Sequence, residues 1–169
     1  MNKLIIMCLI LSSLSINCGY VFHSVLPSHI KTICINTFQN KTTQYNLDNL
    51  LTESVIKNFT YNPQLKIAEE KKADGVLEGE IISYLKEEIS FTENQVKEYR
   101  ITILANVKFR DLVKDKIFWE EKNIEGKAIY SSLQKDTTYF QMISTEEEAI
   151  KESINQLSQK IVNRTISGW

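Results

Sequence analysis

The segment from residue 99 to residue 110 constrains the fold more than any other part of this sequence. Six apolar side chains recur at every second position there, and the side chains between them are mostly polar: Tyr99, Ile101, Ile103, Ala105, Val107 and Phe109 alternate with Arg100, Thr102, Leu104, Asn106, Lys108 and Arg110. A period of two residues places the apolar set on one side of an extended strand. One buried and one exposed face are typical of an antiparallel sheet covered on one side only.

Further strands are expected on both sides of this segment. Residues 76–91 also alternate, with most apolar side chains at odd positions, although Ile82 and Tyr84 are even. We predict a strand whose odd positions face the core, joined to the next strand by a hairpin at residues 94–95. Shorter β-rich runs predict strands at 31–38, 65–68 and 116–124, with a turn at 111–115, whereas 128–140 has no clear period and is interpreted as a surface loop.

Two helices are expected, one before and one after the strands. In residues 45–58 and just beyond, apolar side chains recur at spacings of three and four, with Asn46 as the N-cap: Leu47, Leu50, Leu51, Val55 and Phe59. The second helix is predicted to start after Ser144 or Thr145, because each is followed three residues later by glutamate, as in a capping box. Its apolar stripe comprises Ile150, Ile154, Leu157 and Ile161.

The order of these elements predicts an α+β fold. Strand, helix, strand meander and helix follow one another, which favours a two-layer sandwich. We expect one mostly antiparallel or mixed sheet of about four to five strands, with both helices packed on one face. A single domain is predicted over residues 31–169.

The first residues have the features of an export signal. Lys3 precedes an unbroken apolar run from Leu4 to Leu11, which is too short for a transmembrane helix and fits a signal peptide over residues 1–17. Cys18 resembles the lipidated cysteine of a bacterial lipobox, although Asn17 and Ser15 depart from the usual residues there. The alternative is an ordinary signal peptide with a cysteine near its end. If Cys18 is acylated, diacylglycerol and an N-linked chain such as palmitate anchor residues 18–30 as an extended lead-in.

Charge and composition exclude several classes of function. The chain has 20 Lys and Arg against 21 Asp and Glu, so it lacks the excess positive charge expected of a nucleic-acid-binding protein. His23 and His29 have no partners at metal-ligand spacing. Cys34 lies within a predicted strand, where a buried and inert thiol is favoured over a nucleophile. We therefore expect no enzyme activity, no metal and no cofactor other than the lipid on Cys18.

Several short motifs, in this order, resemble the lipopolysaccharide-assembly lipoprotein family LptE (also RlpB-like). They are Cys18-Gly19-Tyr20-Val21-Phe22, Leu26-Pro27, a strand followed by Phe38-Gln39-Asn40-Lys41-Thr42, Leu50-Thr52 in the first helix, Ala73-Asp74-Gly75-Val76-Leu77-Glu78-Gly79, Phe118-Trp119-Glu120 and the glutamate-led last helix. The resemblance spans nearly the whole mature chain. It implies an outer-membrane lipoprotein that faces the periplasm and the lumen of the LptD β-barrel. There it would assist assembly of the barrel, plug it, and support lipopolysaccharide transport to the cell surface.

A ligand surface can be proposed from the best strand. Arg100, Lys108 and Arg110 share the face opposite the core, where they form a short basic ladder that could hold lipopolysaccharide phosphates. The alternative is the ordinary solvated face of a sheet. A second function also stays open, namely a generic cell-envelope lipoprotein that binds another ligand or pilots a secretin pore.

Overall fold

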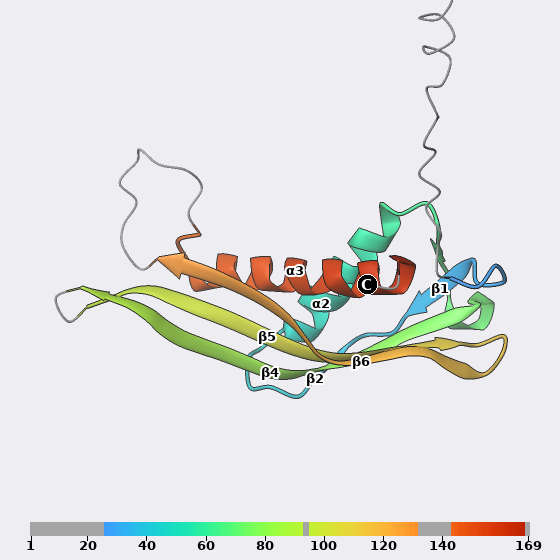
Figure 1. The fold of residues 1–169 in the computed structure, drawn as a ribbon, viewed down its shortest axis with the longest axis horizontal. Helices are drawn as coiled ribbons and strands as arrows, with labels where there is room; N and C mark the ends of the chain where they lie inside the picture. The colour runs from blue at the N-terminus through green and yellow to red at the C-terminus, as the bar shows by residue number, and fades with distance from the viewer. Residues whose placement is uncertain (1–25, 93–94, 132–142, 168–169) are drawn as a thin grey trace, which may run out of the picture.

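The computed structural model describes residues 26–92, 95–131 and 143–167, and it forms two layers (Figure 1). One layer is a sheet of six strands, and the other consists of two helices on one of its faces. The strands are β1 Thr32–Ile35, β2 Gln39–Asn40, β3 Lys66–Ile67, β4 Gly75–Thr92, β5 Gln95–Asp111 and β6 Lys116–Ser131, and the helices are α2 Leu47–Thr60, α3 Glu146–Ser167 and the single 3-10 turn η1 Glu70–Lys72. The predicted α+β class is confirmed.

The sheet is mixed. Its strand order is β3-β1-β4-β5-β6, with β2 pairing beside β1 on β4. β1 pairs in parallel with both β3 and β4, and β2 also pairs in parallel with β4. β4, β5 and β6, by contrast, form a long antiparallel meander. At about 3.3 Å per residue, the 18 residues of β4 extend for roughly 60 Å, so the meander runs well past β1 and under α3 (Figure 1).

The core lies between the helices and one face of the sheet. The predicted apolar set of β5 is confirmed there, since Ile101, Ile103, Ala105, Val107 and Phe109 are all buried. They meet the stripes of the two helices, which the periodicity also placed correctly: Leu47, Leu51, Val55 and Phe59 in α2, and Ile150, Ile154, Leu157 and Ile161 in α3. Burying an aliphatic or aromatic side chain of this size contributes about 1.5–3 kcal/mol.

A β-bulge in β4 overturns the predicted orientation of its second half. Ile81 pairs with Ala105 and Ser83 with Leu104, so that Ile82 has no partner of its own. One extra residue reverses which face the following side chains occupy, and this holds as far as Glu88, where the next register shift begins. Tyr84 therefore faces the helices, and Leu85, expected in the core, is 49% exposed on the opposite face.

The first predicted strand, 31–38, is in fact two short ones. β1 ends at Ile35 and β2 begins at Gln39. Between them Phe38 is buried in the core, and its backbone N–H donates to the Thr52 hydroxyl at 3.1 Å. The ring of Phe38 lies over Gly79, where a Cβ atom would come within 2.6 Å of it. The β2 pairing and this ring contact thus depend on glycine at that position of β4.

The predicted loop over 128–140 is wrong at its start. β6 continues to Ser131, because Ala128 and Tyr130 keep a two-residue period and are buried. Residues 132–140 lie outside the described residues, as do the hairpin residue 94, the predicted signal peptide and Cys18.

The helix starts differ in their chemistry. Asn46 is the N-cap of α2, as predicted, but it adopts a left-handed conformation (φ 64°) and its Oδ1 accepts from the Asn49 amide instead of a backbone N–H. At α3 the capping box is present: the Glu148 N–H donates to Thr145 Oγ1 at 3.2 Å, and Glu148 Oε2 accepts from the Ser144 N–H at 3.0 Å. The capping residues of α3 were thus readable from sequence.

Candidate functional site

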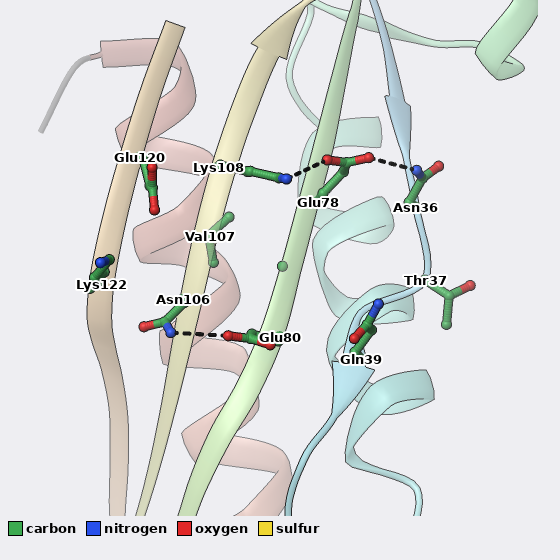
Figure 2. A pocket seen from close by; sticks show the side chains of 11 residues that line it. Asn36, Thr37, Gln39, Glu78, Glu80, Asn106, Val107, Lys108, Glu120 and Lys122 are labelled. Atoms are coloured by element: carbon green, nitrogen blue, oxygen red, sulfur yellow. Dashed lines mark hydrogen bonds and ion pairs between the residues drawn. The ribbon is translucent and has the colours of Figure 1, made fainter. Parts of the chain in front are cut away.

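Polar side chains of β4 and β5 project from the face of the sheet that the helices leave uncovered, which we call the outer face. A groove of about 670 Å³ runs over its middle. Figure 2 shows the groove with the helices behind the sheet. It is lined by Asn36, Thr37, Gln39, Glu78, Gly79, Glu80, Asn106, Val107, Lys108, Glu120 and Lys122.

The charges in this outer-face groove largely compensate one another. Lys108 Nζ lies 3.1 Å from Glu78 Oε2, and the Asn36 amide donates to the other oxygen of that carboxylate at 3.4 Å (Figure 2). One step along the strands, the Asn106 amide donates to Glu80 at 3.3 Å. Three carboxylates and two ammonium groups line the groove. Such a surface offers hydrogen bonds to neutral polar groups more readily than it attracts anions.

The three basic residues singled out from the sequence all lie on the outer face, and each has an acidic neighbour. Lys108 pairs with Glu78, Arg100 Nη1 lies 3.8 Å from Glu87, and Arg110 Nη1 lies 3.8 Å from Asp115. All three cations are about 40–50% exposed, so these pairs add little to stability. They nevertheless lower the local positive potential that a phosphate would meet. Binding of lipopolysaccharide by this ladder stays a prediction.

The structure also separates the ladder into parts. Lys108 lines the outer-face groove, whereas Arg100 lines a second hollow of about 730 Å³ at the edge formed by β6. Eight residues of extended strand, about 26 Å, separate the two. Only Lys108 and Arg110 are close enough to contact a single phosphate-bearing group together.

A polar junction that the sequence did not reveal ties the far part of the meander to α3. Glu146, in the first turn of α3, accepts from the Tyr84 hydroxyl at 2.7 Å and pairs with Lys86 Nζ at 2.6 Å. The ammonium group of Lys86 also lies 4.7 Å from the ring centroid of Tyr99, which stacks on Tyr130. The bulge at Ile82 brings Tyr84 and Lys86 to this face. The sequence-based prediction assumed that the alternation continues without interruption through β4, and it therefore missed the junction.

The junction shifts the acid–base properties of its members. Hydrogen bonds from Lys86 and Tyr84 lower the pKa of Glu146. Burial, followed by the hydrogen bond to Glu146, raises the pKa of Tyr84, and the same carboxylate raises the pKa of Lys86. All three groups therefore keep their ordinary protonation states at neutral pH, which is typical of a structural contact.

Nothing in the described residues has the form of a catalytic centre. The Cys34 thiol is half-buried and donates to Asn36 Oδ1 at 3.5 Å, and burial, with a contribution from Glu70, raises its pKa. A thiol of this kind is a weak nucleophile at neutral pH. Within the described residues, no group of three His, Cys, Asp or Glu side chains could hold a metal ion, and no helix there is both long and apolar enough to span a membrane.

Comparison with known proteins decides the family. The sequence profile of the LptE family, which is described as lipopolysaccharide-assembly, matches residues 30–165. The chain belongs to the LptE family. The match extends from two residues before β1 into the last turn of α3, and so it includes every described strand and both helices. No curated protein matches the sequence.

Solved structures support the fold of this LptE family member. Protein XCC0632 from Xanthomonas campestris has a TM-score of 0.56 at 11% identity, over 89% of this chain and 88% of its own. An uncharacterized lipoprotein B from Nitrosomonas europaea has a TM-score of 0.53 at 14% identity, over 82% of this chain and 83% of its own. At these identities the likeness concerns the fold alone.

Proposed function

We propose that this LptE family member is an outer-membrane lipoprotein that assembles with an LptD-type β-barrel, plugs its lumen and supports the insertion of lipopolysaccharide at the cell surface. The observation that carries the proposal is the family match over residues 30–165. The LptE family is a lipopolysaccharide-assembly family without catalytic activity, in agreement with the expected absence of enzyme activity.

The outer face has the chemistry that a plug requires. Large outer-membrane barrels have polar interiors, so a domain inside one must offer polar groups that pair with the wall. The outer face offers the amides and carboxylates of the groove, and toward the far end the half-exposed side chains of Leu85 and Ile129. A surface of mixed polar and apolar side chains is typical of non-obligate protein–protein interfaces, whose apolar fraction is no higher than that of the rest of a protein surface.

The membrane connection in this proposal is a lipid on Cys18. One acyl chain gives marginal, reversible binding, whereas two or three anchor a protein stably. The leader and lipobox-like residues before Cys18 support processing to an acylated first residue. Mass spectrometry of the native protein tests this directly, with an N-terminal tryptic peptide carrying diacylglycerol as the expected result and an unmodified peptide as the contradicting one.

Purification of the native lipoprotein in mild detergent tests the partner. We expect it to recover a large outer-membrane barrel, and depletion of the lipoprotein to reduce lipopolysaccharide at the cell surface. Recovery of a secretin ring in place of that barrel would overturn the proposal in favour of a pilot lipoprotein. A matched control is another acylated lipoprotein of the same cells, which must not recover the barrel.

A further inference from the structure

One end of the molecule gathers three segments that are far apart in the sequence. They are residues 26–31 before β1, residues 66–72 from β3 through η1, and residues 111–117 around the turn between β5 and β6. Figure 1 shows all three at the right, in blue, green and yellow to orange. We call this region the lysine-rich end.

Asp74 holds the three segments together. Its carboxylate accepts from the backbone N–H groups of Lys31 and Thr32, both at 2.9 Å, and from the Thr32 hydroxyl at 2.8 Å. Its backbone carbonyl accepts from the Leu112 N–H at 2.8 Å. The backbone hydrogen bond from Lys31, followed by the Thr32 hydroxyl, lowers the pKa of Asp74. The carboxylate is therefore ionised but already engaged inside the protein.

Asp111 has the same role one strand further along. It is fully buried, and its Oδ1 accepts from the N–H groups of Val113 and Lys114, both at 3.0 Å. Its Oδ2 lies 2.7 Å from Nε2 of His29, in the segment before β1. The carboxylates of Asp111 and of Asp74, which follows η1, thus make their hydrogen bonds within the protein.

The exposed side chains at this end carry an excess of positive charge. Of its described residues, six lysines are exposed, against three acids: Lys31, Lys66, Lys71, Lys72, Lys114 and Lys116, against Glu69, Glu70 and Asp115. Two of the acids have a cation within 4 Å, because Glu69 lies near Lys72 and Asp115 near Arg110. The whole chain, by contrast, has a formal net charge of −1. The asymmetry is therefore local to this end.

Apolar side chains stand exposed among these lysines. Val113, in the turn between β5 and β6, is 60% exposed, Ile117 at the start of β6 is 54% exposed, and Ile67 in β3 is 42% exposed. A surface with protruding aliphatic side chains between flexible lysines is typical of proteins that lie at a membrane interface.

We propose that the lysine-rich end rests on the bilayer surface, with its lysines on the headgroups of anionic phospholipids and Val113 and Ile117 at the headgroup level. The inference rests on the proposed acylation of Cys18. Leu26, the first described residue, lies only eight positions after Cys18, and eight residue steps span at most about 29 Å. The lipid therefore holds this end, and no other end of the long sheet, close to the membrane. The excess of positive charge and the short tether together favour a lipid surface as the partner of the lysine-rich end.

Vesicle binding without the lipid tests this inference. The chain from residue 18 onward with Cys18→Ser retains every described element, and it is sedimented with vesicles of phosphatidylcholine containing 30% phosphatidylglycerol, and with phosphatidylcholine alone, at low salt. We expect binding to the anionic vesicles only, and its loss at about 0.5 M salt, where screening is nearly complete. Since each lysine at an anionic surface strengthens binding roughly five-fold, Lys114→Glu with Lys116→Glu weakens it more than about ten-fold.

A matched pair of substitutions separates a local site from net charge. Lys41→Glu with Lys122→Glu changes the charge equally at exposed positions away from this end, and we expect less than about a two-fold effect. Lys71→Glu with Lys72→Glu is a second test within the site and must weaken binding as the first pair does. Equal losses in the control, or no binding by the parent chain, overturn the inference.

The outcome is independent of the barrel. A chain that binds anionic vesicles but recovers no barrel from cells rejects the proposed function and keeps this inference. If the lipoprotein recovers the barrel but its unacylated form does not bind anionic vesicles, only the inference is rejected.

Discussion

His29 Nε2 lies 2.7 Å from Asp111 Oδ2 and joins the segment before the first strand to the end of β5, 82 residues further along the chain. Asp111 is fully buried, whereas the side chain of His29 is 25% exposed. The same carboxylate shapes the turn into β6 through the N–H groups of Val113 and Lys114. One buried acid therefore fixes both the entry of the chain into the domain and the hairpin beside it.

Replacing Asp111 by alanine is expected to lower the free energy of unfolding by about 2–4 kcal/mol, because the N–H groups of Val113 and Lys114 lose their acceptor. His29→Ala is expected to cost about 1 kcal/mol, since its ring is partly solvated. Urea denaturation measures both. Glu69→Ala is the control, because that side chain is 81% exposed and its loss should stay within about 0.5 kcal/mol. Equal effects of Asp111→Ala and Glu69→Ala would contradict the role of the buried carboxylate.

Stability is expected to fall in acid through Asp74 and Asp111. Burial opposes ionisation of Asp111, but hydrogen bonds from Lys114 and His29 hold its pKa below the ordinary 3.8, and the pKa of Asp74 is lowered as well. A carboxyl with a lowered folded pKa binds fewer protons when folded, so its contribution is complete above its ordinary pKa and is lost as the pH falls through the folded value. Urea denaturation should show a loss as the pH falls below about 4. Asp74→Asn should be less stable at neutral pH and lose less in acid, and an unchanged acid slope would contradict this.

Glu146→Gln is expected to lower the pKa of Tyr84, because the carboxylate is the second cause of its elevation after burial. The pKa should stay above the ordinary 10, since burial remains. Tyrosine titration followed by NMR or by ultraviolet absorbance measures it. The stability loss should be no more than about 1 kcal/mol, because Glu146 and Lys86 are both more than a third exposed. Glu147→Gln, in the next position of the helix, is the control and should leave Tyr84 unchanged.

Gly126→Ala is expected to loosen the contact between β6 and α3. A Cβ atom there would lie well inside contact distance of the Ser153 carbonyl oxygen and 2.9 Å from Leu157 Cβ. Moving a helix backbone away from the sheet costs about 1–3 kcal/mol or more, as in other overpacked sites. Thermal unfolding of this variant, compared with Lys116→Ala at an exposed position of the same strand, measures the loss. Similar melting temperatures for the two variants would contradict the close approach.

The sequence predicted the core well where the period of the pattern is unbroken. β5 keeps a two-residue alternation along its whole central part, and α2 and α3 keep their apolar stripes, so burial followed directly. It failed where one residue interrupts the period. The unpaired Ile82 exchanges the two faces of β4, and nothing in its own side chain signals a bulge, which depends on how β5 pairs with it.

The candidate site shows the same limit. That Lys108 faces away from the core follows from local alternation alone, but its pairing with Glu78 depends on the register between β4 and β5. The lysine-rich end is likewise a product of topology, because its segments lie about 35 residues or more apart and meet through the pairing of β1 with β3 and through the hydrogen bonds of Asp74 and Asp111. Long-range pairing, unlike periodicity, leaves no local mark in a sequence.

Lys108 and Arg110 on the outer face are the residues of the basic ladder that could contact a lipopolysaccharide phosphate together. If Lys108 and Arg110 hold lipopolysaccharide phosphates, the double variant Lys108→Ala with Arg110→Ala must weaken lipopolysaccharide binding at least about ten-fold, since each charge-assisted contact contributes about 1.5–3 kcal/mol. Glu78→Gln frees Lys108 from its ion pair and should strengthen binding. Calorimetry with purified lipopolysaccharide measures both, and Arg100→Ala, about 26 Å from Lys108, is the control. Unchanged affinity in the double variant, or no gain from Glu78→Gln, would leave these residues as the solvated face of the sheet.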